Sequence, residues 1–106
     1  MSNRLKIYRQ HPEAFTIDLN TDEHCILQPV TGKYYQINAT GLMIWSLLRQ
    51  SNSLEEIHKI INDKNPKISE HQIVLFVSTL CKNYLAIEEE ISVKDFDLYR
   101  ILIGLR

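Results

Sequence analysis

The pattern of apolar and polar side chains in residues 15–37 indicates three short β-strands. Residues 15–19 alternate strictly, as a strand with one buried face does. Turn-forming residues 20–22 separate them from a second apolar segment, residues 24–28. Thr31 and Gly32 then form a turn before residues 33–37, which are rich in aromatic and β-branched side chains. We therefore predict three strands in an antiparallel meander.

From Asn38 onward, apolar residues recur at helical spacing in three segments. Asn38 is a candidate N-cap for the first segment. Ser53 and Ser69 each begin a capping-box pattern, with Glu56 and Gln72 three residues further on. Three helices therefore follow three strands, which is an α+β arrangement with the helices packed on one sheet face.

The apolar positions of these segments define a predicted core. Its members are Ile17, Ile26, Tyr35, Ile37, Ile44, Trp45, Leu48, Ile57, Ile61, Ile73, Phe76, Val77, Leu80 and Leu85.

The C-terminal part of the chain divides at an acidic run. We interpret Glu88–Glu90 as a solvated break, which ends a domain of residues 1–90 and begins a tail of residues 91–106. Residues 95–105 have amphipathic helical spacing, with apolar positions Phe96, Tyr99, Leu102 and Ile103. Two interpretations follow: the tail docks on its own domain, or it binds a partner or a second copy, which would make a homodimer.

Composition narrows the class of protein. A chain of 106 residues with 44% hydrophobic and 24% charged residues has room for one compact domain. A net charge of −1 disfavours binding to nucleic acid or anionic membranes. We find no signal-peptide pattern or membrane-length apolar run, and Cys25 and Cys81 lack CxxC spacing, so we expect a cytoplasmic protein with two reduced thiols.

Candidate chemistry is sparse. The four histidines are scattered without metal-ligand spacing, and His24 and Cys25 point to opposite faces of a strand. Three glycines form no phosphate-binding loop, and no nucleophile and base are paired. We predict no enzyme activity, no metal and no cofactor.

Residues 30–48 resemble the pattern of the PqqD family, which runs Gly-x-x-Tyr-x-Leu-Asn, a small residue, Thr-Gly and Ile-Trp-x-Leu-Leu. Ile37 stands where the family has leucine. Residues 53–57 and the apolar positions of residues 73–85 match later blocks, so the resemblance covers roughly residues 14–89. Tyr84 stands where glycine is usual, so we expect the last helix to run on or to end differently.

The resemblance implies a winged helix-turn-helix-like fold and a function. In this family a non-catalytic domain binds the leader of a ribosomally made precursor peptide as an added strand. It then presents the precursor to a modifying enzyme such as a protease, a cyclase or a radical enzyme. Lasso peptides, radical-modified peptides and quinone cofactor precursors all use such modules.

The implied site lies along the third strand and the third helix. An unpaired strand edge can accept a further strand, and apolar residues on a helix flank can line a groove beside it. An alternative is that Val74 and Cys81 only widen the core. The predicted peptide-binding residues are Lys33, Tyr34, Tyr35, Gln36, Ile37, Val74, Val77, Ser78 and Cys81.

Two other functions are compatible with this fold. A winged helix-turn-helix domain can regulate transcription, but residues 69–83 offer a single basic side chain, Lys82, for contact with DNA. The C-terminal tail could also make the chain a protein–protein adaptor.

Overall fold

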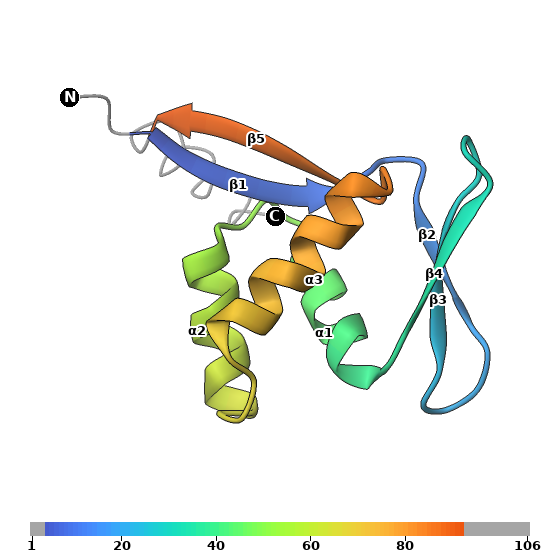
Figure 1. Ribbon diagram of the computed structural model, residues 1–106, viewed down its shortest axis with the longest axis horizontal. Helices are drawn as coiled ribbons and strands as arrows, with labels where there is room; N and C mark the ends of the chain where they lie inside the picture. Colours follow the sequence, from blue (N-terminus) through green and yellow to red (C-terminus); the bar gives the residue numbers. More distant parts are fainter. Residues whose placement is uncertain (1–3, 93–106) are drawn as a thin grey trace.

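The computed structural model describes residues 4–92, in which three helices lie beside two small β-sheets, below one and to the left of the other in the view of Figure 1. In chain order the elements are β1 (Arg4–Gln10), β2 (Phe15–Asp18), β3 (His24–Gln28), β4 (Lys33–Ile37), α1 (Ala39–Leu47), α2 (Leu54–Lys64), α3 (Glu70–Lys82) and β5 (Ala86–Ser92).

The predicted meander is confirmed as a three-stranded antiparallel sheet with the order β2-β3-β4. Ile26 and Ile37 point from this sheet into the core, where they are 0% and 5% exposed. The buried side chains of His24 and Gln28 lie on the same inner face, because strand residues two apart share a face. With three helices following, the fold is the predicted α+β, winged helix-turn-helix-like arrangement.

Side chains cap the three helices at the predicted positions. The Asn38 Oδ1 atom accepts from the Gly41 amide at 2.9 Å, and the Ser53 hydroxyl accepts from the Glu56 amide at 3.2 Å. Ser69 and Gln72 form a complete capping box, since each side chain accepts from the other residue's backbone amide. These caps satisfy amides that a helix start leaves without partners.

Helix α3 ends at the position where the family pattern has glycine. Tyr84 takes a left-handed backbone conformation there, with φ 59°. The Leu85 amide donates to the Leu80 carbonyl at 2.9 Å, and the Tyr84 amide donates to the Cys81 carbonyl at 3.2 Å. This is the Schellman pattern of hydrogen bonds. The helix therefore does not run on, and the tyrosine adopts the conformation that a glycine would.

A second, two-stranded sheet pairs β1 with β5 antiparallel, and the sequence patterns did not predict it. The interpretation of Glu88–Glu90 as a solvated break is wrong, because these residues lie within β5. The Tyr8 hydroxyl donates to Glu88 and the Arg9 guanidinium pairs with Glu89, each at 2.8 Å. The partners of this acidic run lie near the other end of the chain, so its local sequence does not reveal the pairing.

Most of the predicted core is confirmed, with three exceptions. Ile17 is 44% exposed because it lies on the face of the sheet that points away from the helices. Tyr35 and Phe76 are only partly buried, at the border of the core. The core also includes Ile7, Tyr8 and Ala86 from the second sheet. The predicted C-terminal amphipathic segment lies outside the described residues.

Candidate functional site

Strand β4 presents an open edge. It is the outermost strand of its sheet, so within residues 4–92 no strand pairs with one side of its backbone. Of its five residues, Lys33 alone is charged. Native proteins usually protect such edges with charges, bulges or covering loops. A strand edge without this protection can accept an added strand.

The other sheet edges differ from this one. The outer side of β1 is bonded to the α1–α2 loop, where the Tyr8 amide donates to the Asn52 carbonyl at 2.8 Å and the Gln10 amide to the Leu48 carbonyl at 2.9 Å. Strand β5 carries three consecutive glutamates. The hollow beside β2 is more polar than the one beside β4, with Arg49 among its lining residues.

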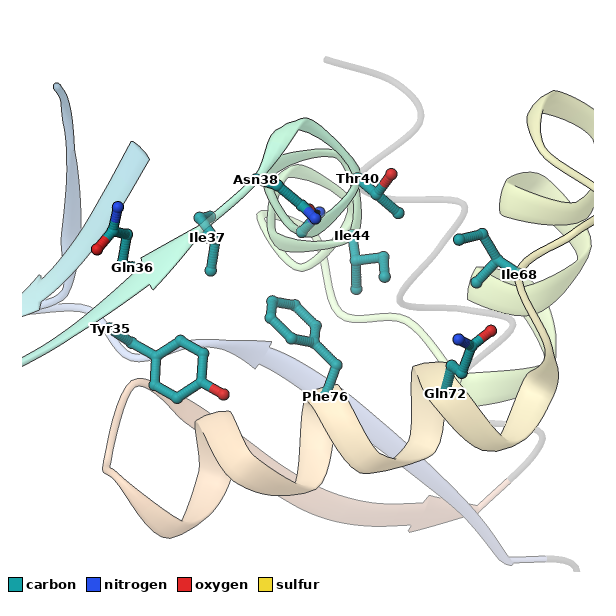
Figure 2. A pocket seen from close by; sticks show the side chains of 10 residues that line it. Tyr35, Gln36, Ile37, Asn38, Thr40, Ile44, Ile68, Gln72 and Phe76 are labelled. Carbon is teal, nitrogen blue, oxygen red and sulfur yellow. Dashed lines mark hydrogen bonds between the residues drawn. The ribbon is translucent and has the colours of Figure 1, made fainter. Parts of the chain in front are cut away.

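A cleft of about 310 Å³ separates β4 from α3 (Figure 2). Residues of β4, of the start of α1, of the α2–α3 turn and of α3 line it. They are Tyr35, Gln36, Ile37, Asn38, Thr40, Gly41, Ile44, Ile68, Gln72 and Phe76. None of these side chains is charged, so the cleft suits apolar and uncharged polar groups.

Two aromatic rings meet across one end of the cleft. Tyr35 projects from β4 toward α3 and Phe76 projects from α3 toward β4 (Figure 2). Their ring centroids lie 6.4 Å apart with the planes inclined by 67°, an edge-to-face contact. Because both side chains are only partly buried, they offer an apolar wall to a ligand.

Gly41 brings α1 close to the end of β4. A Cβ atom at this position would lie 2.9 Å from Ile37 Cβ and 3.4 Å from the Phe76 ring. The 2.9 Å contact with Ile37 is too short for a side chain to be added at this position without movement. Gly41 therefore allows α1 to lie close to the end of β4, beside the cleft.

Gln28 fixes the sheet against the end of α3. Its side chain is 1% exposed and donates from Nε2 to the Tyr84 carbonyl at 2.7 Å. Its Oε1 atom accepts from the Val30 amide at 3.1 Å. The β3–β4 turn and the C-terminus of α3 are thus joined through one buried amide.

The five predicted β4 residues divide by strand alternation. Tyr35 and Ile37 point toward the helices, whereas Tyr34 and Gln36 point to the opposite face. Lys33 and Tyr34 are exposed and do not line the cleft. Tyr35, Gln36 and Ile37 line the cleft. The Gln36 side chain points away from α3, so this residue lies at the edge of the cleft.

The predicted α3 residues do not line the cleft. Val77 is 0% exposed in the core, so its side chain cannot reach a ligand in this structure. Cys81 and Val74 are partly buried on the flank of the core stripe away from Phe76, since successive side chains turn by roughly 100° around a helix. Ser78 is exposed.

Gln72 and Phe76 occupy the flank that faces β4, and they are the α3 residues that line the cleft. The spacing of Ile73, Val77 and Leu80 predicts where the core stripe runs. It does not tell which of the two flanks faces the sheet edge. Of the newly found residues, Phe76 was detectable as an apolar residue but was assigned to the core.

The perturbed titratable groups lie away from the cleft. Burial and the nearby Glu88 carboxylate raise the pKa of the Cys81 thiol to about 11. Burial and the hydrogen bond to Glu88 raise the pKa of Tyr8 well above its usual value. Within residues 4–92, no three His, Cys, Asp or Glu side chains are grouped to hold a metal ion. No helix in the same part of the chain is long and apolar enough to cross a membrane.

Comparison with known proteins gives one family and a shared fold. Residues 23–86 match the family described as Coenzyme PQQ synthesis protein D (PqqD). The match begins just before β3 and ends where β5 begins, so β1 and β2 lie outside it. No curated protein sequence matches the chain significantly.

Two solved structures share the fold. One is TbiB1 in complex with the TbiA(beta) leader peptide, which is 24% identical, has a TM-score of 0.60, and covers 74% of this chain and 93% of its own. The other is lasso peptide synthetase B1 complexed with the leader peptide, at 21% identity and a TM-score of 0.60, covering 76% and 96%. At these identities, the likeness concerns the fold.

Proposed function

The chain belongs to the PqqD family, and on this premise we propose that it binds the leader of a ribosomally made precursor peptide. The leader adds as a strand to the open edge of β4 and lies against α3. The domain itself is non-catalytic and presents the precursor to a modifying enzyme, a protease, a cyclase or a radical enzyme, in the cytoplasm. The observation that carries this proposal is the uncharged cleft that runs directly beside an unprotected strand edge.

Strand addition uses the two parts of the site differently. In an antiparallel pair, alternate residues turn their N–H and C=O groups away from the partner strand. On β4 these outward groups bond the leader backbone independently of its sequence. Alternate leader side chains then enter the cleft between Tyr35 and Gln72, where apolar contact provides the selectivity. The names of both structural neighbours describe complexes with leader peptides, which is in keeping with this mode.

The lining of the cleft favours binding over catalysis. It contains no carboxylate, histidine or cysteine that could act as base, nucleophile or metal ligand. Since no charge lines the cleft, we expect leader affinity to depend only weakly on ionic strength. The DNA-binding alternative gains no support, because the exposed residues of α3 include Glu70 and a single basic side chain, Lys82.

The test is a titration of the isotope-labelled protein with the synthetic leader of the precursor encoded beside it. We expect amide shifts in β4 and around Gln72 and Phe76. Phe76→Ala should weaken binding roughly tenfold through lost apolar contact, whereas His71→Ala, an exposed change on the same helix, should not. Leaders N-methylated at alternate positions should bind in one register and fail in the other, because each methyl removes a backbone donor. Shifts confined to other surfaces, or equal tolerance of both methylation registers, would refute strand addition on β4.

A further inference from the structure

The face of the β2–β3–β4 sheet that points away from the helices carries a row of exposed apolar side chains. We name it the outer face and define it by six residues that share one side of the sheet: Phe15, Ile17, Cys25, Leu27, Tyr34 and Gln36. The register places Phe15 opposite Leu27 and Leu27 opposite Tyr34, in one line across three strands. Phe15, Ile17 and Tyr34 are 46%, 44% and 70% exposed.

Such a face is unusual for a small antiparallel sheet. A sheet that packs one face on the core normally turns polar residues toward solvent on the other. Here Gln36 is the only amide side chain among the six residues of the outer face. Two further exposed apolar side chains lie near the ends of the sheet, Leu19 directly after β2 and Val30 in the β3–β4 turn. These residues are not part of the core, to which this sheet contributes Ile26 and Ile37 of its inner face. A contiguous apolar patch of this kind marks a surface that a partner covers.

A carboxylate lies at one border of the outer face. Glu23 is exposed and directly precedes β3 in the same alternation as Cys25 and Leu27, whereas Asp18 turns to the inner face and pairs with His24 at 2.7 Å. Gln36 on the outer face donates from its amide to the Glu23 carboxylate at 2.9 Å, which holds that charge beside the patch. A second copy of this chain would bring like charges together, whereas a partner with lysine or arginine around an apolar centre would meet opposite charges.

The outer face also continues into the site on β4. A strand added to β4 directs every second side chain to the same side as Tyr34 and Gln36. A protein seated on the outer face would therefore touch the bound leader at its border. An enzyme bound to the outer face would therefore contact the leader in the leader-bound domain and lack this contact in the leader-free domain.

We propose that the outer face is the docking surface for the modifying enzyme, which meets it with an apolar patch bordered by lysine and arginine. The identity of this partner rests on the proposed function. The leader and the enzyme then occupy two adjoining surfaces of one small sheet, its β4 edge and its outer face. Enzyme affinity rises when the leader is bound, because the leader enlarges the surface that the enzyme contacts.

The test uses the full chain and the modifying enzyme encoded with it, with affinities measured separately for enzyme and leader. Ile17→Lys places a charge in the outer face and should weaken enzyme binding by about tenfold or more. Because Ile17 lies two strands from the β4 edge, leader affinity should stay unchanged. Phe15→Ser is a second variant on the same face, should the first fail to fold. Phe76→Ala should do the reverse, with the leader weakened and enzyme binding without leader retained. Leu75→Lys, which adds the same charge at an exposed position on α3, is the matched control and should leave enzyme binding intact.

The electrostatic part is tested by Glu23→Lys, which should weaken enzyme binding and reduce its salt dependence. Unchanged enzyme affinity in the two outer-face variants would overturn the proposal, as would an enzyme that does not bind the wild-type chain. Sedimentation of the chain alone provides a further test, since a dimer that Ile17→Lys dissociates would show a second copy on this face instead. Loss of leader binding alone would count against the proposed function and not against this surface.

Discussion

Tyr84 has a left-handed backbone conformation that is unfavourable for a residue other than glycine. It is the one non-glycine residue among residues 4–92 with a positive φ. An L-residue in the left-handed region costs roughly 1–2 kcal/mol relative to the right-handed helix. The hydrogen bonds from the Tyr84 and Leu85 amides to α3, and the bond from Gln28 to the Tyr84 carbonyl, hold the backbone there.

We expect Tyr84→Gly to stabilise the protein by up to about 1 kcal/mol, because glycine adopts this φ without strain while losing more entropy on folding. The side chain is 61% exposed, so little packing is lost. Tyr84→Ala is the control, since alanine retains the strain and should not gain stability. Urea unfolding of the three proteins measures the difference, and equal midpoints for the glycine and alanine variants would contradict this account.

Cys81 predicts how stability responds to alkaline pH. Its pKa is about 11 in the folded protein against an ordinary value of 9.0. Between these values the unfolded chain loses a proton that the folded chain retains, so the free energy of unfolding should fall as pH rises through this window. Tyr8, whose pKa is also raised, acts in the same direction at higher pH.

The measurement is the urea midpoint of the wild type and of Cys81→Ala from pH 7 to 10.5. The wild type should lose stability more steeply above pH 9 than the variant does. The Cys81 thiol should also react slowly with a thiol reagent at pH 8 in the folded state. Rapid labelling there, or parallel pH profiles, would show that the pKa is not raised.

At the scale of elements, the sequence predicted those features that depend on contacts between residues close together in the chain. The caps of α1 to α3 depend on residues three apart, so the sequence patterns located them. The pairing of β1 with β5 joins residues about 80 positions apart, such as Tyr8 and Glu88, and no local pattern reports it. The open edge of β4 was predictable from the meander. The flank of α3 that faces this edge was not, because it depends on how the helix packs.

Gly41 allows a prediction about the contact between β4 and α1. In Gly41→Ala the new methyl would meet Ile37 Cβ at 2.9 Å, so α1 must move away from the strand. Overpacking of this kind typically costs about 1–3 kcal/mol. Leader affinity should fall as well, since Gly41 and Ile37 both line the cleft.

Thermal unfolding and leader titration of the variant measure both effects. Ser46→Ala, an exposed change in the same helix, should alter neither one. A Gly41→Ala protein with unchanged stability and affinity would show that the contact is not restrictive.

At the scale of the whole molecule, Gln28 connects the sheet to the helical part of the fold. Gln28→Leu preserves most of the side-chain volume but leaves the Tyr84 carbonyl and the Val30 amide without their partner. A hydrogen bond within a protein contributes roughly 0.5–1.5 kcal/mol to its stability. With two such bonds lost, we expect a loss of about 1–3 kcal/mol in the free energy of unfolding, with weaker leader binding as α3 loosens from the sheet.

Gln36→Leu is the matched control for this change, being the same substitution at an exposed position in the same sheet. Its unfolding free energy should stay within about 0.5 kcal/mol of the wild type. Denaturant titrations of both variants decide the matter, and equal losses would mean that the buried amide has no special role.

The antiparallel β1–β5 ribbon sets Arg4 directly opposite Ser92. Residues paired in this way lie with their Cα atoms about 4.5–5.5 Å apart. The two ends of the described fold therefore lie side by side, at the end of the β1–β5 ribbon that is far from the β2–β3–β4 sheet (Figure 1). Because these ends are adjacent, residues 4–92 can be inserted as one domain into a surface loop of another protein without obstructing β4. For the same reason, a short linker between the ends suffices for circular permutation.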